Sequence, residues 1–439
     1  MLNRQRWKTA AAVALGILAG AFFMELGAAA LYAVDKGGLV WTRATPPRVS
    51  VDLRVENDKR IRLHPYVGYT GRRGMKLASV MGAEDIQTQF GDRFAREDFP
   101  TLGFNNHGFL ARVDYPYVKA ADEFVVGVFG GSVAVQFSLT AHHELSEALE
   151  AAGVLKGRKL VLLDFAHGGA KQPQQATALA YFLALGQRFD YVITLDGFNE
   201  AFIGWYNMVE HAAAPEMPFA RFVLGIQNID LSEAGSPVGG SEHRSAALAS
   251  RSWGEREQGT RSGIAWLVSS IVARHARSRL AEIERKATTK AESFDYSMPL
   301  LPAPPGGFAE VGVPRIASIW RDASIAMKGM CDRLGIPYLH VLQPNQYALE
   351  LDYGGSEVER KRVRGLDHPP VSEFVPMIYR AYRAQAPALS AAGIELVDGG
   401  PPFEGKPSRL FHDNCCHLNY DGNAILAQLI AGRMLRAGP

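Results

Sequence analysis

Hydrophobic residues form one long stretch near the N-terminus. Residues 9–34 contain no Lys or Arg, and Glu25 is their only charged residue. The stretch is long enough to cross a bilayer as a helix. Arg4, Arg6 and Lys8 precede it, and positive residues favour the cytoplasmic side of a membrane. We therefore predict a single-pass N-terminal anchor over residues 1–35, with the C-terminal domain outside the cytoplasm, in the periplasm.

A cleaved signal peptide is the alternative interpretation of this stretch. Its small residues 27–30 (Gly-Ala-Ala-Ala) are suited to cleavage, and a charge such as Glu25 is costly in lipid. The length of the apolar stretch favours an anchor that is not cleaved. The sequence leaves both interpretations open.

From residue 121 onward, short apolar runs alternate with helical stretches. The runs are rich in Val, Ile and Leu, as strands buried on both faces are; they cover residues 124–129, 159–165, 191–195, 338–342 and 394–397. One helix is predicted from Pro173, which suits the first helical position, to Gly186, which suits the stop. Strands alternating with helices predict an α/β fold, a three-layer α/β/α arrangement around a mainly parallel five-stranded sheet.

Two regions lie outside this alternation. Residues 36–120 are punctuated by Pro and Gly, and they are predicted to be an irregular N-terminal extension. Residues 205–314 are predicted to be an insertion or lid, which divides the main domain into residues 121–204 and 315–439. The insertion has a polar segment over 232–260 and a helix whose apolar positions are Ile264, Leu267, Val268, Ile271 and Val272. The basic end of this helix could contact anionic lipid, whereas Glu282 and Glu284 favour a solvated face.

Composition and charge are those of a globular protein. The 439 residues are 47% hydrophobic and 21% charged, and the formal net charge of +2 implies no polyanionic partner, so no nucleic acid. Cys331, Cys415 and Cys416 form neither a disulfide framework nor a repeated zinc pattern. Adjacent cysteines seldom bridge each other, although one of them could pair with Cys331 in an oxidising compartment.

Polar and small residues follow the first three predicted strands. Ser132 stands after Gly130 and Gly131, which let the backbone turn and expose the hydroxyl. Gly168 and Gly169 follow the second strand and open a helix, where backbone N–H groups can point at a developing negative charge. Asn199 follows the third strand and can offer its side-chain NH₂. Taken alone, the serine and glycine motifs favour an ordinary turn or helix cap, and the asparagine is equally consistent with a turn.

Asp413 and His417 lie close together near the C-terminus. An imidazole can take the proton of a serine hydroxyl, and a carboxylate can orient the ring. His412 is a competing base. The run Cys415-Cys416-His417 could suggest metal binding, but the sequence has no second ligand cluster, so we expect no metal and no diffusible cofactor.

The order of these motifs resembles that of the SGNH (GDSL-like) hydrolase family, in its membrane-anchored bacterial form. The four blocks of that family correspond to Gly130-Gly131-Ser132, with Gly131 in place of the usual Asp, to residues 166–169, to Gly197-Phe198-Asn199, and to residues 417–423. The family places its Asp three residues before the His. Here Asp413 stands four before, and Asn414 holds the usual position. We expect the turn to bulge by one residue so that Asp413 reaches the ring.

The resemblance implies a serine esterase that acts on small esters, acetylated sugars or lipids without a cofactor. Ser132 would be the nucleophile, His417 the base and Asp413 the orienting residue. The oxyanion hole would be formed by Ser132, Gly168 or Gly169, and Asn199. Two alternatives remain open at this point, a polysaccharide O-acetyltransferase on the same fold and a non-catalytic glycan-binding or assembly protein.

Overall fold

The computed structural model describes residues 2–42, 61–79, 101–220, 222–223, 249–250, 253–254, 256–257, 260–291, 301–365 and 371–435. The chain divides into two compact units. One comprises Met1–Asn57 and Gln227–Ser297, and the other comprises Asp58–Ile226 and Met298–Pro439. The domain boundaries expected from the sequence, near residues 35, 120, 204 and 314, stay predictions.

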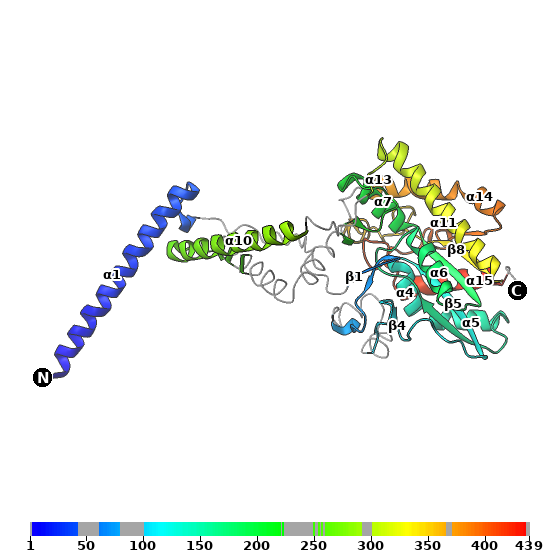
Figure 1. The fold of residues 1–439 in the computed structure, drawn as a ribbon, viewed down its shortest axis with the longest axis horizontal. Helices are drawn as coiled ribbons and strands as arrows, with labels where there is room; N and C mark the ends of the chain where they lie inside the picture. Colours follow the sequence, from blue (N-terminus) through cyan, green and yellow to red (C-terminus); the bar gives the residue numbers. More distant parts are fainter. Residues whose placement is uncertain are drawn as a thin grey trace. The chain divides into compact units, whose positions relative to one another are not determined.

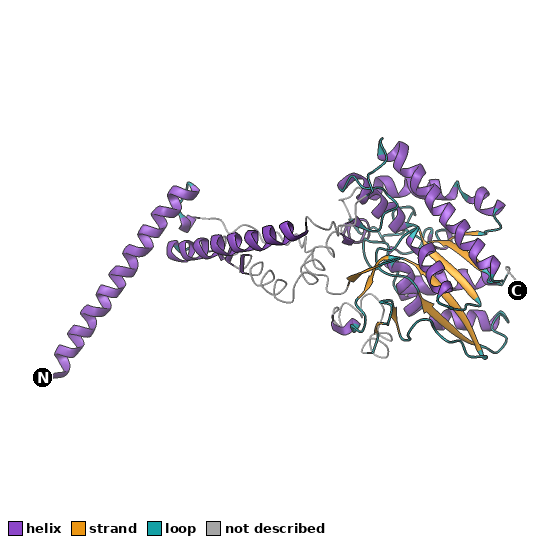
Figure 2. Cartoon of the chain, in the orientation of Figure 1, coloured by secondary structure: helices purple, strands orange, loops and turns teal. Residues whose placement is uncertain are grey.

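The larger unit is built on a sheet of five parallel strands (Figure 2). The strands are β5 (Glu123–Gly130), β6 (Lys159–Asp164), β7 (Tyr191–Asp196), β8 (Tyr338–Leu342) and β9 (Leu396–Asp398), in the order β6-β5-β7-β8-β9. All neighbours pair in parallel. The five predicted strands and the predicted fold class are thus confirmed.

Helices cover both faces of the sheet and complete the three layers. On one face, the helices that contact one another are α4 (Ser132–Thr140), α5 (His142–Ala151) and α15 (Tyr420–Met434). On the other, they are α6 (Gln174–Ala184), α7 (Phe198–Glu210), α11 (Val313–Arg333), α13 (Val371–Arg383) and α14 (Ala386–Ala391). Helix α12 (Glu357–Arg364) and the short helical turns η3 (Phe308–Gly312), η4 (Pro401–Phe403) and η5 (Ser408–Leu410) lie in the connections.

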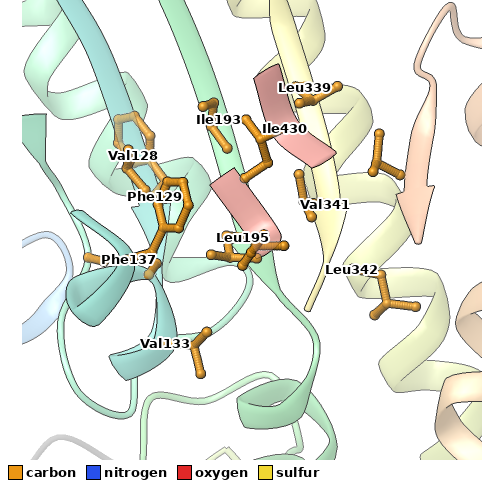
Figure 3. Packing of buried hydrophobic residues seen from close by; sticks show 14 of the residues in the cluster. Val128, Phe129, Val133, Phe137, Ile193, Leu195, Leu339, Val341, Leu342 and Ile430 are labelled. Carbon is orange, nitrogen blue, oxygen red and sulfur yellow. The ribbon is translucent and has the colours of Figure 1, made fainter. Parts of the chain in front are cut away.

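The core explains why the strands have continuous runs of apolar residues in the sequence. Every residue of β5, β7 and β8 is buried, because helices pack on both sides of these central strands. Figure 3 shows Phe129 and Val341 of the sheet among side chains that include Phe137 of α4 and Ile430 of α15. This packing fixes the positions of the strand ends.

The strand order places a topological switch point between β5 and β7. The chain passes from β5 to β6 on one side and then returns to β7 on the other. In such sheets the connections diverge at this point, and ligands bind at the carboxyl ends of the two strands. The residues that follow Gly130 and Asp196 are therefore expected to line a site.

The N-terminal extension adds small sheets to the larger unit. An antiparallel hairpin pairs β1 (Ile61–His64) with β2 (Gly68–Gly71), and β3 (Gly103–Phe104) pairs with β4 (Leu110–Ala111). The short turn η2 (Leu77–Ser79) lies between them. Tyr69 of β2 packs edge-on against His167, with ring centroids 4.8 Å apart. The hairpin therefore lies against the loop that follows β6.

The smaller unit contains α1 (Leu2–Lys36) and α10 (Gly263–Ala291), both labelled in Figure 1, and the turn η1 (Val40–Thr42). Both predicted helices are present. Within α1, the 22 residues Leu15–Lys36, with a mean hydropathy of 1.8, are long and apolar enough to cross a membrane. Most of the polar segment predicted over 232–260 lies outside the described residues.

Glu25, the one charged residue of the apolar stretch, has hydrogen-bond partners at the N-terminus of α10. Its carboxylate accepts from the Ser262 hydroxyl at 2.9 Å and from the amides of Gly263 and Ile264 at 2.5 and 3.0 Å. The two amides are unpaired donors of the helix N-terminus, where negative charge is favoured. Contacts with α10 therefore offset part of the cost of this charge.

Candidate active site

Ser132 lies at the turn between β5 and α4. Gly131 is the N-cap residue, and Ser132 is the first residue of the helix. Its amide therefore has no acceptor within the helix. The backbones of β5 and β7 approach each other so closely that position 130 requires a glycine. A Cβ atom there would stand 2.2 Å from the carbonyl oxygen of Leu195 on β7. The sharp turn thus presents the Ser132 hydroxyl at the switch point.

Three side chains form a continuous hydrogen-bonded chain at this turn. His417 Nε2 lies 2.7 Å from Ser132 Oγ, and His417 Nδ1 lies 2.5 Å from Asp413 Oδ2. The imidazole can therefore accept the serine proton at Nε2 while Nδ1–H donates to the carboxylate. This is the relative arrangement of nucleophile, base and orienting acid in serine hydrolases.

The turn from Asp413 to His417 contains the extra residue seen in the sequence. Cys416 takes up a left-handed conformation, with φ of 75°. Asp413 Oδ1 accepts from the Cys415 amide at 2.8 Å and from the His417 amide at 3.2 Å. The carboxylate thus bonds both to the backbone of its own turn and to the ring, and the Asn414 side chain does not take its place.

Residues after β8 hold this turn in place. Gln346 Nε2 donates to the carbonyl of Asp413 at 3.2 Å, and the Tyr347 hydroxyl donates to the carbonyl of Asn414 at 2.9 Å. Neither contact could be predicted from the sequence, because the two segments are 67 residues apart along the chain. The apolar run of β8 was the only nearby sequence signal.

The pKa shifts of His417 and Asp413 support a role for His417 as the base. Burial opposes the charged imidazole, but the hydrogen bond and the charge of Asp413 outweigh it, so the pKa of His417 is raised above its usual 6.5. Burial also disfavours the Asp413 carboxylate, yet its bonds to His417 and Cys415 lower its pKa to about 2. Asp413 is therefore ionised at any physiological pH.

His412 lies beside the hydrogen-bonded side chains of Ser132, His417 and Asp413 and is not part of their network. Its ring stacks on that of His417, with centroids 5.5 Å apart and an angle of 11° between the planes. Its Nε2 lies 3.3 Å from Gln136 Nε2, and burial lowers its pKa to about 4. Because His417 contacts Ser132 Oγ, the alternative with His412 as the base has no support in this geometry.

The same residues include the one group of possible metal ligands found in the described part of the chain. Ligand atoms of His412, Asp413 and His417 lie within 4.8 Å of one another. Both ring nitrogens of His417 already have partners, Asp413 and Ser132. A metal ion would therefore have to displace one of these two hydrogen bonds.

Asn199 approaches Ser132 from the end of β7. It is the second residue of α7, and its Nδ2 donates to the carbonyl of Ala170 at 2.9 Å. A Cβ atom on Gly131 would lie 2.0 Å from the same Nδ2. The Asn199 amide thus lies directly against the backbone that precedes Ser132.

Gly168 and Gly169 lie in the loop after β6. Gly169 has φ of 77°, and a Cβ atom there would stand 2.7 Å from the Tyr69 hydroxyl. No hydrogen-bond partner is found for either glycine amide among the residues that the structure describes. Both amides remain available to a ligand, and the geometry does not decide which of them is the donor.

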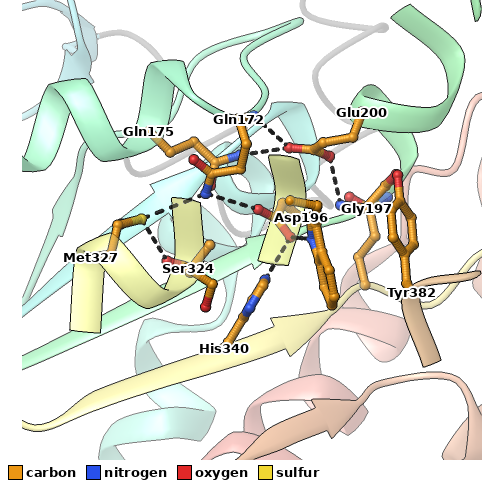
Figure 4. A network of polar contacts seen from close by, with 12 residues as sticks. Gln172, Gln175, Asp196, Gly197, Glu200, Ser324, Met327, His340 and Tyr382 are labelled. Atoms are coloured by element: carbon orange, nitrogen blue, oxygen red, sulfur yellow. Dashed lines mark hydrogen bonds and ion pairs between the residues drawn. The ribbon is translucent and has the colours of Figure 1, made fainter. Parts of the chain in front are cut away.

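A buried carboxyl group links the loop after β6 to the turn after β7 (Figure 4). Glu200 Oε2 accepts from the Gly197 amide at 2.9 Å, and Oε1 accepts from the Gln172 amide at 2.8 Å and from Gln175 Nε2 at 3.1 Å. Burial raises the pKa of Glu200, and the amides of Gln172 and Gly197 oppose that shift. Glu200 thereby sets the spacing between the glycine loop and Asn199.

Asp196 extends this network beneath the site. It accepts from Trp320 Nε1 at 2.6 Å and from Gln172 Nε2 at 3.3 Å, and its Oδ1 lies 2.9 Å from His340 Nε2. These contacts could not be predicted from the sequence either. Only Glu200 had a local signal, since a Glu three residues after an N-cap indicates a capping box.

Comparisons with known proteins add little to this geometry. No family model matches the chain, and no curated protein matches it significantly. Among solved structures, the chain is similar to an acetyl xylan esterase, AlAXEase, with a TM-score of 0.34 and 12% sequence identity over 71% of this chain and 99% of that chain. A likeness at this level says nothing about activity.

Proposed function

We propose that the larger unit is a serine esterase of the SGNH type that hydrolyses O-acyl esters outside the cytoplasm. The observation that carries this proposal is the chain Ser132–His417–Asp413, with contacts of 2.7 and 2.5 Å. A hydroxyl is a weak nucleophile unless a positioned base removes its proton, and this arrangement supplies that base.

The acylation step begins with the attack of Ser132 Oγ on the ester carbonyl carbon. His417 Nε2 takes the serine proton as the bond forms, and the imidazolium is stabilised by the ionised Asp413. The tetrahedral intermediate then collapses, and His417 gives the same proton to the departing alkoxide. The products of this half-reaction are the free alcohol and an acyl ester on Ser132.

Three groups are proposed to stabilise the oxyanion of the intermediate. They are the Ser132 amide, the amide of Gly168 or Gly169, and the side-chain amide of Asn199. Preorganised donors of this kind are effective because they need no reorientation as the charge develops. The Asn199 bond to Ala170 uses one of its two amide hydrogens and leaves the other for the oxyanion.

Deacylation repeats these steps with water as the nucleophile. His417 takes a proton from the water, and the second tetrahedral intermediate releases the carboxylic acid and restores the Ser132 hydroxyl. The proposed substrates are O-acyl esters, and the sequence resemblance implies small esters, acetylated sugars or lipids among them. A sugar hydroxyl in place of water would make the same site an O-acetyltransferase.

Turnover of a small acetyl ester tests this function. The wild-type chain should hydrolyse it, and Ser132→Ala should reduce kcat by about a thousandfold or more, since the residual activity of serine hydrolases without their triad is low. Ser146→Ala, on α5, is the matched control and should retain wild-type activity. If acetyl transfer to an added glycan exceeds hydrolysis, the acetyltransferase is correct; a chain that does neither is a non-catalytic protein.

We also propose that α1 anchors this domain on the outer side of the cytoplasmic membrane. The support is its apolar composition and the Arg and Lys residues that precede residue 9. A reporter enzyme fused after Pro439 should be active only outside the cytoplasm. Activity of the same fusion inside the cytoplasm would overturn the proposed orientation.

A further inference from the structure

The first three turns of α10 expose apolar side chains and bury serines. Val268 and Ile271 are 47% and 58% exposed, whereas Ser269 and Ser270 between them are only 4% and 6% exposed. Val268 and Ile271 are three residues apart, so they lie on the same face of the helix. A helix at the surface of a water-soluble domain shows the opposite pattern, with its apolar side chains turned inward.

The buried face of α10 consists largely of small residues. Ala273 and Ala276 are buried on it together with the two serines. The Ser270 hydroxyl donates to the carbonyl of Leu267 at 3.0 Å, so this buried polar group is satisfied within its own helix. Small residues at helix contacts, with larger apolar side chains turned outward, are typical of helices that pack in lipid.

An aromatic pair joins the start of α10 to α1. The Trp266 ring packs edge-on against Tyr32, with centroids 5.1 Å apart, and both side chains are buried in one small cluster. Glu25, two turns earlier in α1, accepts hydrogen bonds from the N-terminus of α10. Trp and Tyr are enriched where a membrane meets water. This pair therefore indicates the level of the membrane surface.

The length of α1 indicates the same level. At about 1.5 Å per residue, the helix rises about 24 Å from Thr9 to Glu25, while the hydrocarbon core of a bilayer is about 30 Å thick. With residue 9 at the cytoplasmic boundary, Glu25 approaches the opposite boundary. The N-terminus of α10, which is bonded to Glu25, then starts near the membrane surface outside the cytoplasm.

We propose that residues 263–273 of α10 lie in the bilayer interface outside the cytoplasm, with Val268 and Ile271 in contact with lipid acyl chains. Interfacial helices bury an apolar face about 5–10 Å into the boundary between headgroups and acyl chains, and their basic residues are attracted to anionic lipids. Arg274, which is exposed, follows the apolar turns directly and suits the headgroup level. The proposal rests on the anchor proposed for α1 and does not depend on the esterase activity.

Lipid photolabelling tests this placement on the full-length chain. The protein is reconstituted in vesicles of phosphatidylethanolamine and phosphatidylglycerol that contain a small fraction of a lipid with a diazirine on its acyl chain. The diazirine stands near the glycerol backbone in one sample and at the end of the chain in the other. Illumination converts it to a carbene, which inserts into C–H bonds of the groups that it touches.

Tryptic peptides report on the two helices separately. Cleavage after Lys8 and Lys36 releases residues 9–36 of α1, and cleavage after Arg261 and Arg274 releases residues 262–274 of α10. The shallow diazirine should label both peptides, because both helices cross the interface level. The deep diazirine should label peptide 9–36 and leave peptide 262–274 almost unlabelled.

A double variant tests the two apolar side chains themselves. Val268→Asp combined with Ile271→Asp should reduce shallow labelling of peptide 262–274 by about tenfold or more, because a charged side chain is strongly disfavoured in lipid. Labelling of peptide 9–36 should stay unchanged. The matched control is Val358→Asp on α12, an apolar residue that is 82% exposed outside the smaller unit, and it should leave both peptides labelled as in the wild type.

The pattern of labelling separates this proposal from the anchor. The interfacial placement is overturned if the shallow diazirine labels peptide 9–36 alone, if the deep one labels peptide 262–274 equally well, or if the double variant is labelled like the wild type. A cross-link between the 262–274 peptides of two copies, without lipid labelling, would also overturn it and identify a second chain as the occupant. Lipid labelling of peptide 262–274 alone supports the placement and contradicts the anchor, and labelling of neither peptide contradicts both.

Discussion

The side-chain amide of Asn199 occupies the space that a side chain at Gly131 would need. A Cβ atom on Gly131 would lie 2.0 Å from Asn199 Nδ2, well inside van der Waals contact. A glycine at position 131, where the family resemblance leads one to expect an Asp, is thus coupled to the position of Asn199. Any larger residue at 131 must displace the proposed oxyanion donor or the turn that carries Ser132.

Gly131→Ala should therefore impair catalysis without unfolding the protein. Loss of one oxyanion donor costs about 10²–10³ in kcat, and a displaced Asn199 should approach the lower figure. The matched control is Gly432→Ala on α15, where an added Cβ meets no atom within 4 Å. Kinetics on a small acetyl ester check this, and equal kcat values for both variants would contradict the coupling of residues 131 and 199.

Asp413 and Asn414 can be distinguished by substitution. Asp413→Asn should reduce kcat by about three to four powers of ten, because an amide can neither stabilise the imidazolium nor hold the required tautomer. Asn414→Ala should cost far less, because the Tyr347 hydroxyl donates to the backbone carbonyl of Asn414, which the substitution keeps. The reverse ranking would mean that Asp413 does not orient His417 during turnover.

The pH dependence of kcat/KM should reflect the raised pKa of His417. Only the neutral imidazole can accept the serine proton, so activity should fall as the pH drops through a value above 6.5. Asp413, with its pKa of about 2, stays ionised over this range and adds no second step. A pH profile of the wild-type enzyme measures this midpoint, and a midpoint below 6.5 would show that Asp413 does not stabilise the charged ring in solution.

Glu200→Gln should separate positioning from simple folding. The Gln amide has one acceptor instead of two, so either Gly197 or Gln172 loses its partner, at a cost of about 1–3 kcal/mol in stability. We expect kcat to fall about tenfold, because the relative position of Asn199 and the glycine loop affects the oxyanion more than substrate binding. KM should change less than about twofold.

Two comparisons complete the Glu200 experiment. Glu150→Gln, exposed on α5, should have no effect on kinetics or melting temperature. Glu200→Asp, which keeps both acceptors on a shorter side chain, should recover part of kcat. If Glu200→Gln lowers the melting temperature and leaves kcat unchanged, its role is structural only.

Much of the fold could be predicted from local patterns in the sequence. The five buried strands read as apolar runs because both of their faces are covered, and the glycines at 130 and 131 marked a sharp turn. The bulge that brings Asp413 to His417 could also be predicted, since charge made Asp413 the stronger partner for an imidazolium. In each case a single segment carried the information.

The contacts that could not be predicted join segments far apart in the chain. Glu25 looked like an uncompensated charge until the N-terminus of α10 supplied its donors, 237 to 239 residues later. Gln346 and Tyr347, which follow β8, hold the turn from Asp413 to His417. Tyr69 contacts the loop after β6 from a region that was predicted to be irregular. Hydrophobic periodicity carries no information about such pairs, because they depend on how the elements pack in three dimensions.

The reactivity of Ser132 tests the central claim most directly. A serine-directed fluorophosphonate should label the wild-type chain once, and peptide mass spectrometry should place the label on Ser132. Labelling should be lost in Ser132→Ala, become much slower in His417→Ala, and remain at the wild-type rate in Ser146→Ala. If Ser132 stays unlabelled in the folded wild-type protein, or if His417→Ala reacts as fast as the wild type, then the chain Ser132–His417–Asp413 does not activate a nucleophile.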